Sequence, residues 1–187
     1  MQVISLTYED VKKNCQQLYH KVCLSAFTPD LVLGIKTGGE DLAKLIYKEY
    51  KEDECQLRSC SVFRKSSGAK KKIFKNILHL LPNFISDRLR IIEAKLFFTK
   101  KKRQIEKVNL PQDISSFCKI LIIDDAIDSG STINAVVEAV KKLNPKSDIK
   151  TCVITVTKKN PELLPDFYLF NNETLIRFPW SMDAIKK

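Results

Sequence analysis

The stretch Ile120-Leu-Ile-Ile-Asp-Asp-Ala-Ile-Asp-Ser-Gly-Ser-Thr132 decides the fold of this chain. Its first four residues, 120–123, are apolar and favour a strand that is buried on both faces, as in a parallel sheet. Two carboxylates, Asp124 and Asp125, follow at the carboxyl end of that strand, where open α/β sheets bind their ligands. We therefore expect an α/β protein with its site at this edge of the sheet.

A polar turn from Asp128 to Thr132 separates this strand from an apolar helical pattern that begins at Ile133. Gly130 permits a close backbone approach, and the free N–H groups at a helix start bind phosphate well. Carboxylates suited to hydroxyls or a metal, next to a phosphate cradle, suggest a sugar phosphate as the ligand. An ordinary strand-to-helix turn is the alternative, although such turns rarely carry so many polar groups in this order.

Residues 120–132 resemble the signature with which type I phosphoribosyltransferases bind 5-phosphoribosyl 1-pyrophosphate (PRPP). The resemblance implies the fold of that family, an α/β fold with a Rossmann-like parallel sheet flanked by helices and a small hood. It also implies an enzyme that uses PRPP with Mg²⁺ as the donor and releases pyrophosphate. In these terms Asp124 and Asp125 hold the ribose hydroxyls or the Mg²⁺, and the 5-phosphate lies on Ser129, Gly130, Ser131 and Thr132.

A second loop, Lys36-Thr37-Gly38-Gly39, follows the apolar run at 31–35 and precedes a helical pattern. Such a loop can offer N–H donors and one cation to a pyrophosphate, but alone the pattern is also that of a tight turn. In the family the corresponding loop holds the pyrophosphate of PRPP. The resemblance therefore gives this role to all four residues of the loop.

The resemblance also implies catalytic and acceptor-binding residues. Asp128 matches the carboxylate proposed as general base in 6-oxopurine enzymes, and Arg64 and Lys65 match a basic pair that neutralises the departing pyrophosphate. A solvated strand end is the alternative for that pair. Phe178 and Trp180 resemble the hood of xanthine- and guanine-specific members, where an aromatic side chain stacks on the base; for Trp180 the alternative is a core anchor.

The 187 residues suit one domain, with a helical insertion at about 69–103 and a hood element at about 165–187. No apolar run approaches the roughly 20 residues of a transmembrane helix, and residues 1–5 lack the pattern of a secretion signal. We therefore expect a cytoplasmic protein. The six cysteines form no Cys-x-x-Cys pair and are expected to be reduced thiols rather than metal ligands or disulfides.

The net charge of +10 lies in one segment, because residues 64–103 contain 13 Lys or Arg against two acids, whereas the remainder carries −1. Apolar spacings of three and four predict two amphipathic helices hinged near Pro82. An anionic membrane surface attracts such an element, which predicts peripheral contact with the inner face of a membrane. A hairpin buried against its own domain or in a homodimer is an equally strong alternative. Nucleic acid is not expected, since apolar residues outnumber base-stacking aromatics there.

Three hypotheses remain for the function. We favour transfer to a hydroxyl of a membrane-linked glycan in polysaccharide biosynthesis, because the basic segment makes up over a fifth of the chain and resembles phosphoribosyltransferase-like proteins of polysaccharide clusters. The alternative is salvage of a 6-oxopurine (xanthine, guanine or hypoxanthine), which Asp128, Phe178 and Trp180 support. A non-catalytic PRPP sensor is the third hypothesis, but the complete acid pair, Asp128 and Lys36 argue for catalysis.

Overall fold

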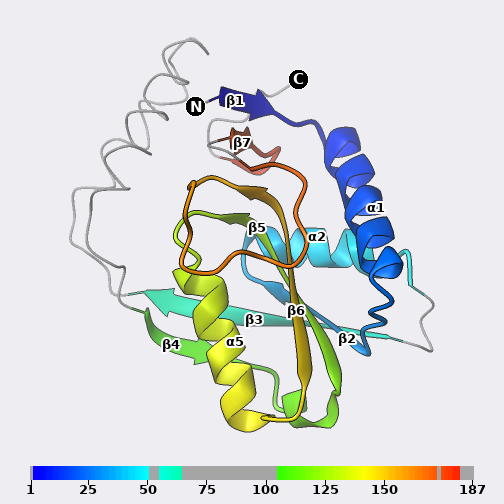
Figure 1. Cartoon of the computed structure of the whole chain (residues 1–187), viewed down its shortest axis with the longest axis vertical. Helices are drawn as coiled ribbons and strands as arrows, with labels where there is room; N and C mark the ends of the chain where they lie inside the picture. Colours follow the sequence, from blue (N-terminus) through cyan, green and yellow to red (C-terminus); the bar gives the residue numbers. More distant parts are fainter. Residues whose placement is uncertain (1, 51–54, 65–104, 172–173, 182–187) are drawn as a thin grey trace.

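The computed structural model describes residues 2–50, 55–64, 105–171 and 174–181 (Figure 1). Lys65, the predicted helical insertion at 69–103 and the last residues of the predicted hood element, 182–187, lie outside the described residues. In chain order the elements are β1 (Gln2–Ser5), α1 (Tyr8–Leu24), β2 (Leu31–Ile35), α2 (Gly38–Tyr47), β3 (Gln56–Arg64), β4 (Ile105–Asn109), a short 3-10 helix (Ile114–Ser116), β5 (Lys119–Ile127), α5 (Ser131–Leu143), β6 (Asp148–Val156) and β7 (Thr174–Arg177).

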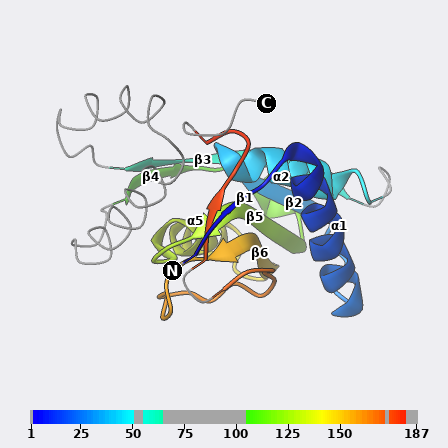
Figure 2. The ribbon, with the colours of Figure 1, turned by 90° about the horizontal axis from the view of Figure 1, so that it is seen from above.

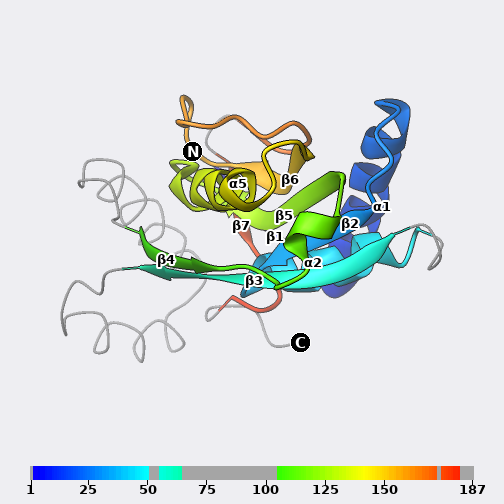
Figure 3. The same ribbon diagram turned by 90° about the horizontal axis from the view of Figure 1, so that it is seen from below.

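The central sheet has five strands in the order β4-β3-β2-β5-β6. Strands β3, β2, β5 and β6 are parallel, and β4 closes one edge antiparallel to β3 (Figure 3). Residues 120–123 of β5 have no exposed surface, as the apolar run predicts. Leu121 and Ile123 pack with residues of α1 and α2, whereas Ile120 and Ile122 pack with residues of α5. Helices therefore cover both faces of the parallel sheet, which confirms the predicted fold class.

Local signals account for the helix ends. Thr7 caps α1 in a capping box: its hydroxyl accepts the N–H of Asp10 at 3.2 Å, and the Asp10 carboxylate accepts the N–H of Thr7 at 2.9 Å. Helix α1 then packs its apolar residues Val11, Cys15 and Leu18 into the core.

Among the helices in the described parts of the chain, none is long and apolar enough to cross a membrane. All six cysteines are free thiols.

A second, two-stranded sheet pairs the two ends of the described chain. Strands β1 and β7 run parallel, with Val3 beside Leu175 and Ile4 beside Ile176, and they lie side by side in Figure 2. Strand β1 was not predicted from the sequence. Phe167 and Phe170 make two isolated bridges to β6.

Candidate functional site

The carboxylates Asp124 and Asp125 lie inside β5 rather than after it. The strand continues to Ile127 because β6 supports it, with Asp124 beside Val153 and Ala126 beside Thr155. On the other side the pairing with β2 stops at Ile123. Beyond Ile123, β5 no longer pairs with β2. The start of α2 occupies the space beside this part of β5.

The glycine loop (residues 36–39) fills the gap and meets the acid pair. A Cβ atom on Gly39 would lie 2.5 Å from the Ile123 carbonyl oxygen and 2.7 Å from the Asp124 Cα, and one on Gly38 would overlap the Asp125 carboxylate. Only glycine allows the first turn of α2 to approach β5 so closely. The structure therefore places the two glycines against the acids, and Lys36 and Thr37 directly precede them in the same loop. The peptide bond between Lys36 and Thr37 is cis.

Burial and mutual repulsion act on the two acids. Burial raises the pKa of Asp124 well above its usual range, and the charge of Asp125 raises it further as a smaller effect. Burial also raises the pKa of Asp125, although a hydrogen bond from the Trp180 indole opposes the shift. The N–H of Asp125 donates to Asp124 Oδ1 at 2.9 Å. Two crowded carboxylates of this kind gain from a cation or from hydroxyl donors.

The serine turn (residues 128–132) lies between β5 and α5. Gly130 has a φ of +84°, and α5 begins at the next residue. The hydroxyls of Ser129 and Ser131 are 3.0 Å apart, and the Ser129 carbonyl accepts the N–H of Glu162 at 2.8 Å. A Cβ on Gly130 would lie 3.0 Å from the backbone nitrogen of Leu163. The loop after β6 therefore backs the turn and holds its shape.

Arg64, the last residue of β3, reaches the serine turn. Its guanidinium donates to the Thr132 hydroxyl at 2.6 Å, and its charge lowers the pKa of Asp124, against the stronger effect of burial. We expected this side chain to serve the pyrophosphate, which the glycine loop would hold. The structure places it on the opposite loop, beside the expected 5-phosphate position.

Asp128 is exposed at the start of the serine turn and has a partner that the sequence analysis missed. The Thr157 hydroxyl donates to Asp128 Oδ1 at 2.5 Å, and the Thr157 N–H donates to the Ile127 carbonyl at 2.8 Å. Thr157 is the first residue after β6, the neighbour of β5. The one sequence feature that could have indicated this contact is that Thr157 directly follows β6, because β6 pairs in parallel with β5.

The aromatic pair near the C-terminus is stacked, with ring centroids 5.0 Å apart and planes inclined by 7°. Phe178 is only 5% exposed and belongs to the core, whereas the Trp180 indole N–H donates to Asp125 Oδ2 at 3.4 Å. Ser181 closes this turn through hydrogen bonds with both backbone groups of Phe178. Trp180 thus lies beside the acid pair with Phe178 as its support, so the two aromatics do not play equal parts.

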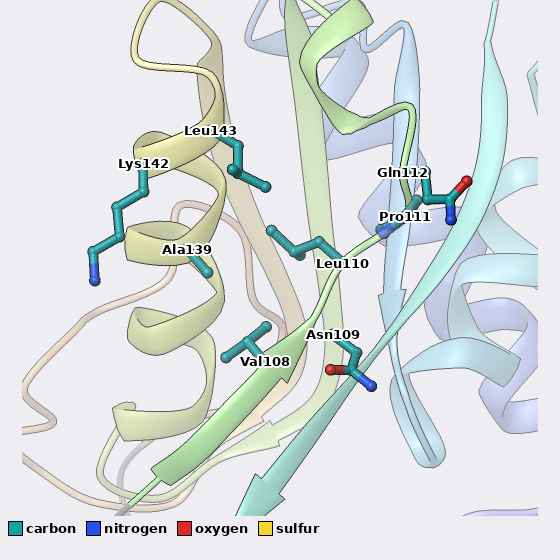
Figure 4. A pocket seen from close by; sticks show the side chains of 8 residues that line it. All are labelled: Val108, Asn109, Leu110, Pro111, Gln112, Ala139, Lys142 and Leu143. Carbon is teal, nitrogen blue, oxygen red and sulfur yellow. The ribbon is translucent and has the colours of Figure 1, made fainter.

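A separate hollow of about 520 Å³ lies between the β4 edge and α5, and Figure 4 shows its side chains. Val108 and Leu110 face Ala139 and Leu143 across it. No residue of the acid pair, the glycine loop or the serine turn lines it. In the described parts of the chain, no group of three or more His, Cys, Asp or Glu could hold a metal ion.

The acid pair, the glycine loop and the serine turn lie together at one edge of the parallel sheet of an α/β fold. The sequence matches the phosphoribosyl transferase domain family over residues 5–184, and the chain belongs to this family and is a phosphoribosyltransferase. A search of curated proteins found no match.

Several solved structures share the fold. A purine phosphoribosyltransferase from Pyrococcus horikoshii is 23% identical, with a TM-score of 0.63 over 97% of this chain and 95% of that one. A xanthine-guanine-hypoxanthine phosphoribosyltransferase from Helicobacter pylori is 17% identical, with a TM-score of 0.66 over the same shares. A hypothetical protein from Neisseria gonorrhoeae with bound ppGpp is 17% identical, with a TM-score of 0.63 over 99% of this chain and 91% of that one.

Proposed function

We propose that this enzyme transfers the 5-phosphoribosyl group of PRPP to a 6-oxopurine base and releases pyrophosphate. The observation that carries the proposal is the meeting of the acid pair, the glycine loop, the serine turn and Asp128 at one edge of the sheet. Similar structures that are named as purine enzymes support the choice of acceptor. The glycan acceptor that we favoured from the sequence rested on residues 64–103, of which only Arg64 is described.

The donor would span the two loops. Asp124 and Asp125 would accept hydrogen bonds from the ribose hydroxyls and would hold Mg²⁺, which neutralises charge on the pyrophosphate. Their crowding and raised pKa fit a cation. Because the described residues contain no group of three or more His, Cys, Asp or Glu that could hold a metal ion, oxygens of PRPP and water would complete the shell, as is usual for Mg²⁺.

The phosphates would lie at opposite ends of the donor. The glycine loop, with Lys36 and Thr37 before the start of α2, would take the pyrophosphate. The serine turn would take the 5-phosphate at the start of α5. Arg64 would add its charge at the serine turn, where it already contacts Thr132, rather than at the pyrophosphate.

The acceptor would lie between Asp128 and Trp180. The face of Trp180 that is turned away from Phe178 would stack on the purine. As the base nitrogen bonds to the anomeric carbon, its proton would pass to the Asp128 carboxylate, and pyrophosphate would leave with the electron pair of the broken C–O bond. Phe178 would hold Trp180 in place without contacting the acceptor.

The test is pyrophosphate release from PRPP and Mg²⁺ in the presence of single acceptors. We expect turnover with guanine, xanthine or hypoxanthine, and none with a lipid-linked sugar. Asp128→Asn should lower kcat by at least about 100-fold, the usual contribution of a general base. Release with the lipid-linked sugar and with no purine would contradict the proposal.

A further inference from the structure

Thr157 makes a side-chain contact with Asp128 that the pairing of β5 with β6 does not require. Its hydroxyl oxygen is 2.5 Å from Asp128 Oδ1, and the residue is only 3% exposed. The ends of β5 and β6 are already joined here by the main-chain bond from the Thr157 N–H to the Ile127 carbonyl, at 2.8 Å. The hydroxyl therefore adds something other than strand pairing.

The hydroxyl has one proton and two acceptors within reach. The Ile127 carbonyl lies 3.1 Å from the Thr157 hydroxyl oxygen, but it already accepts the backbone N–H of the same residue. The Asp128 carboxylate is closer and, when ionised, is the stronger acceptor. The proton therefore goes to Asp128 Oδ1.

We propose that Thr157 is a positioning residue that holds one oxygen of Asp128 so that the other faces the purine nitrogen. This rests on the proposed function, in which Asp128 accepts the proton. Asp128 is exposed in a turn, and a free aspartate there would move among several rotamers. A proton acceptor that is held in one orientation avoids that loss, since catalysis depends steeply on the position of the reacting groups.

The first experiment removes the hydroxyl and keeps the shape. Thr157→Val should lower kcat about tenfold, as expected for a misplaced but intact base. It should change KM for PRPP by less than about twofold, because the proposed donor position does not involve Thr157. Thr157→Ser, which restores a hydroxyl, should recover most of kcat. A Thr157→Val variant with full kcat would overturn the proposal.

A matched control lies on β6, the strand that Thr157 directly follows. Thr151 is also buried, at 4% exposed, and its hydroxyl donates to Asp166 Oδ2 at 2.8 Å. Six residues of strand, roughly 20 Å, separate it from Thr157. Thr151→Val removes the same kind of bond and should keep kcat within about twofold even if it lowers Tm. An equal fall in kcat for Thr151→Val and Thr157→Val would mean that both act through stability, and would also overturn the proposal.

A double-mutant cycle separates positioning from general damage. If Thr157 acts through the Asp128 carboxylate, adding Thr157→Val to Asp128→Asn should change kcat by less than about twofold. A full additional tenfold loss would contradict the proposal. Wild-type enzyme that turns over no purine would contradict the proposed function itself, whereas an active wild type with an equally active Thr157→Val variant would contradict only the role of Thr157.

Discussion

Gly130 in the serine turn has a positive φ of +84°, whereas Gly38 and Gly39 in the glycine loop are the first two residues of a helix. The first glycine supplies a backbone conformation that L side chains rarely adopt. The other two supply space, because a Cβ on either would overlap the acid-bearing part of β5. Both loops look alike in the sequence, as glycines between a strand and a helix. One depends on conformation and the other on close packing.

The largest effect should come from filling the space at Gly39. In an unconstrained helix Gly→Ala stabilises by about 1 kcal/mol, but at Gly39 the new methyl would meet backbone atoms of Ile123 and Asp124 at 2.5 and 2.7 Å. We expect Gly39→Ala to lower the free energy of unfolding by about 3 kcal/mol, measured by urea unfolding. Gly38→Ala should cost less, since its methyl meets the Asp125 side chain, which can turn. Equal stability of Gly39→Ala and the wild type would refute the packing argument.

The acid pair behind the glycine loop should show opposite effects on stability and on binding. Because burial raises the pKa of Asp124, its contribution to stability is present at low pH and is lost as the pH rises through the raised pKa. Asp124→Asn should therefore raise Tm by a few degrees at pH 8 and by less at pH 5. The same change should weaken PRPP binding at least about tenfold in calorimetry.

Asp148 provides the control for this comparison, since it is an exposed aspartate at the other end of β6. Asp148→Asn should leave both Tm and PRPP affinity close to the wild-type values. If the gain in Tm for Asp124→Asn does not grow between pH 5 and pH 8, the buried charge of Asp124 does not destabilise the fold, and the prediction is wrong.

Gly130 should respond to conformation more than to size. Gly130→Ala would place an alanine in the left-handed region at a cost of about 1–2 kcal/mol. Gly130→Asn adds a larger side chain but tolerates this backbone better, and so should cost less. Thermal unfolding of both variants decides the matter: if Asn is worse than Ala, the close approach to Leu163, and not φ, requires the glycine.

The smallest effect should be on ligand affinity, and it should differ between the ligand of the serine turn and the ligand of the glycine loop. Arg64→Ala should weaken binding of ribose 5-phosphate about fivefold and leave the affinity for pyrophosphate unchanged, because Arg64 contacts Thr132 in the serine turn. Arg58 on the same strand pairs with Asp113 at 2.9 Å instead. Arg58→Ala should change neither affinity. Selective loss of pyrophosphate binding in Arg64→Ala would restore the role that we first expected from the sequence.

The sequence predicted those parts of the molecule that local patterns determine. The apolar runs at 31–35 and 120–123 and the two glycine-containing loops gave the parallel sheet and the joining of the loops at one edge. Strand β1 was missed because its partner β7 lies about 170 residues away, and a four-residue strand carries little periodicity. Thr157 was missed since a threonine after a strand has many ordinary roles.

We propose different roles for two of the predicted site residues, for reasons that no linear pattern contains. The long side chain of Arg64 reaches the Thr132 hydroxyl in the serine turn, and these two residues lie far apart in the sequence. Phe178 and Trp180 are two residues apart, but one is buried and the other lies on the acid pair. The glycan hypothesis gave weight to charge in a segment outside the described residues. The purine hypothesis depended on residues of the site itself.

Trp180 is the one tryptophan in the sequence, and its indole N–H is 3.4 Å from an oxygen of Asp125. The fluorescence emission of an indole depends on the charge and hydrogen bonding around it. A ligand that engages the Asp125 carboxylate would alter that bond, and a base stacked on the ring would quench its emission. The protein thus contains a label-free optical probe whose signal should distinguish donor binding from acceptor binding in a stopped-flow experiment.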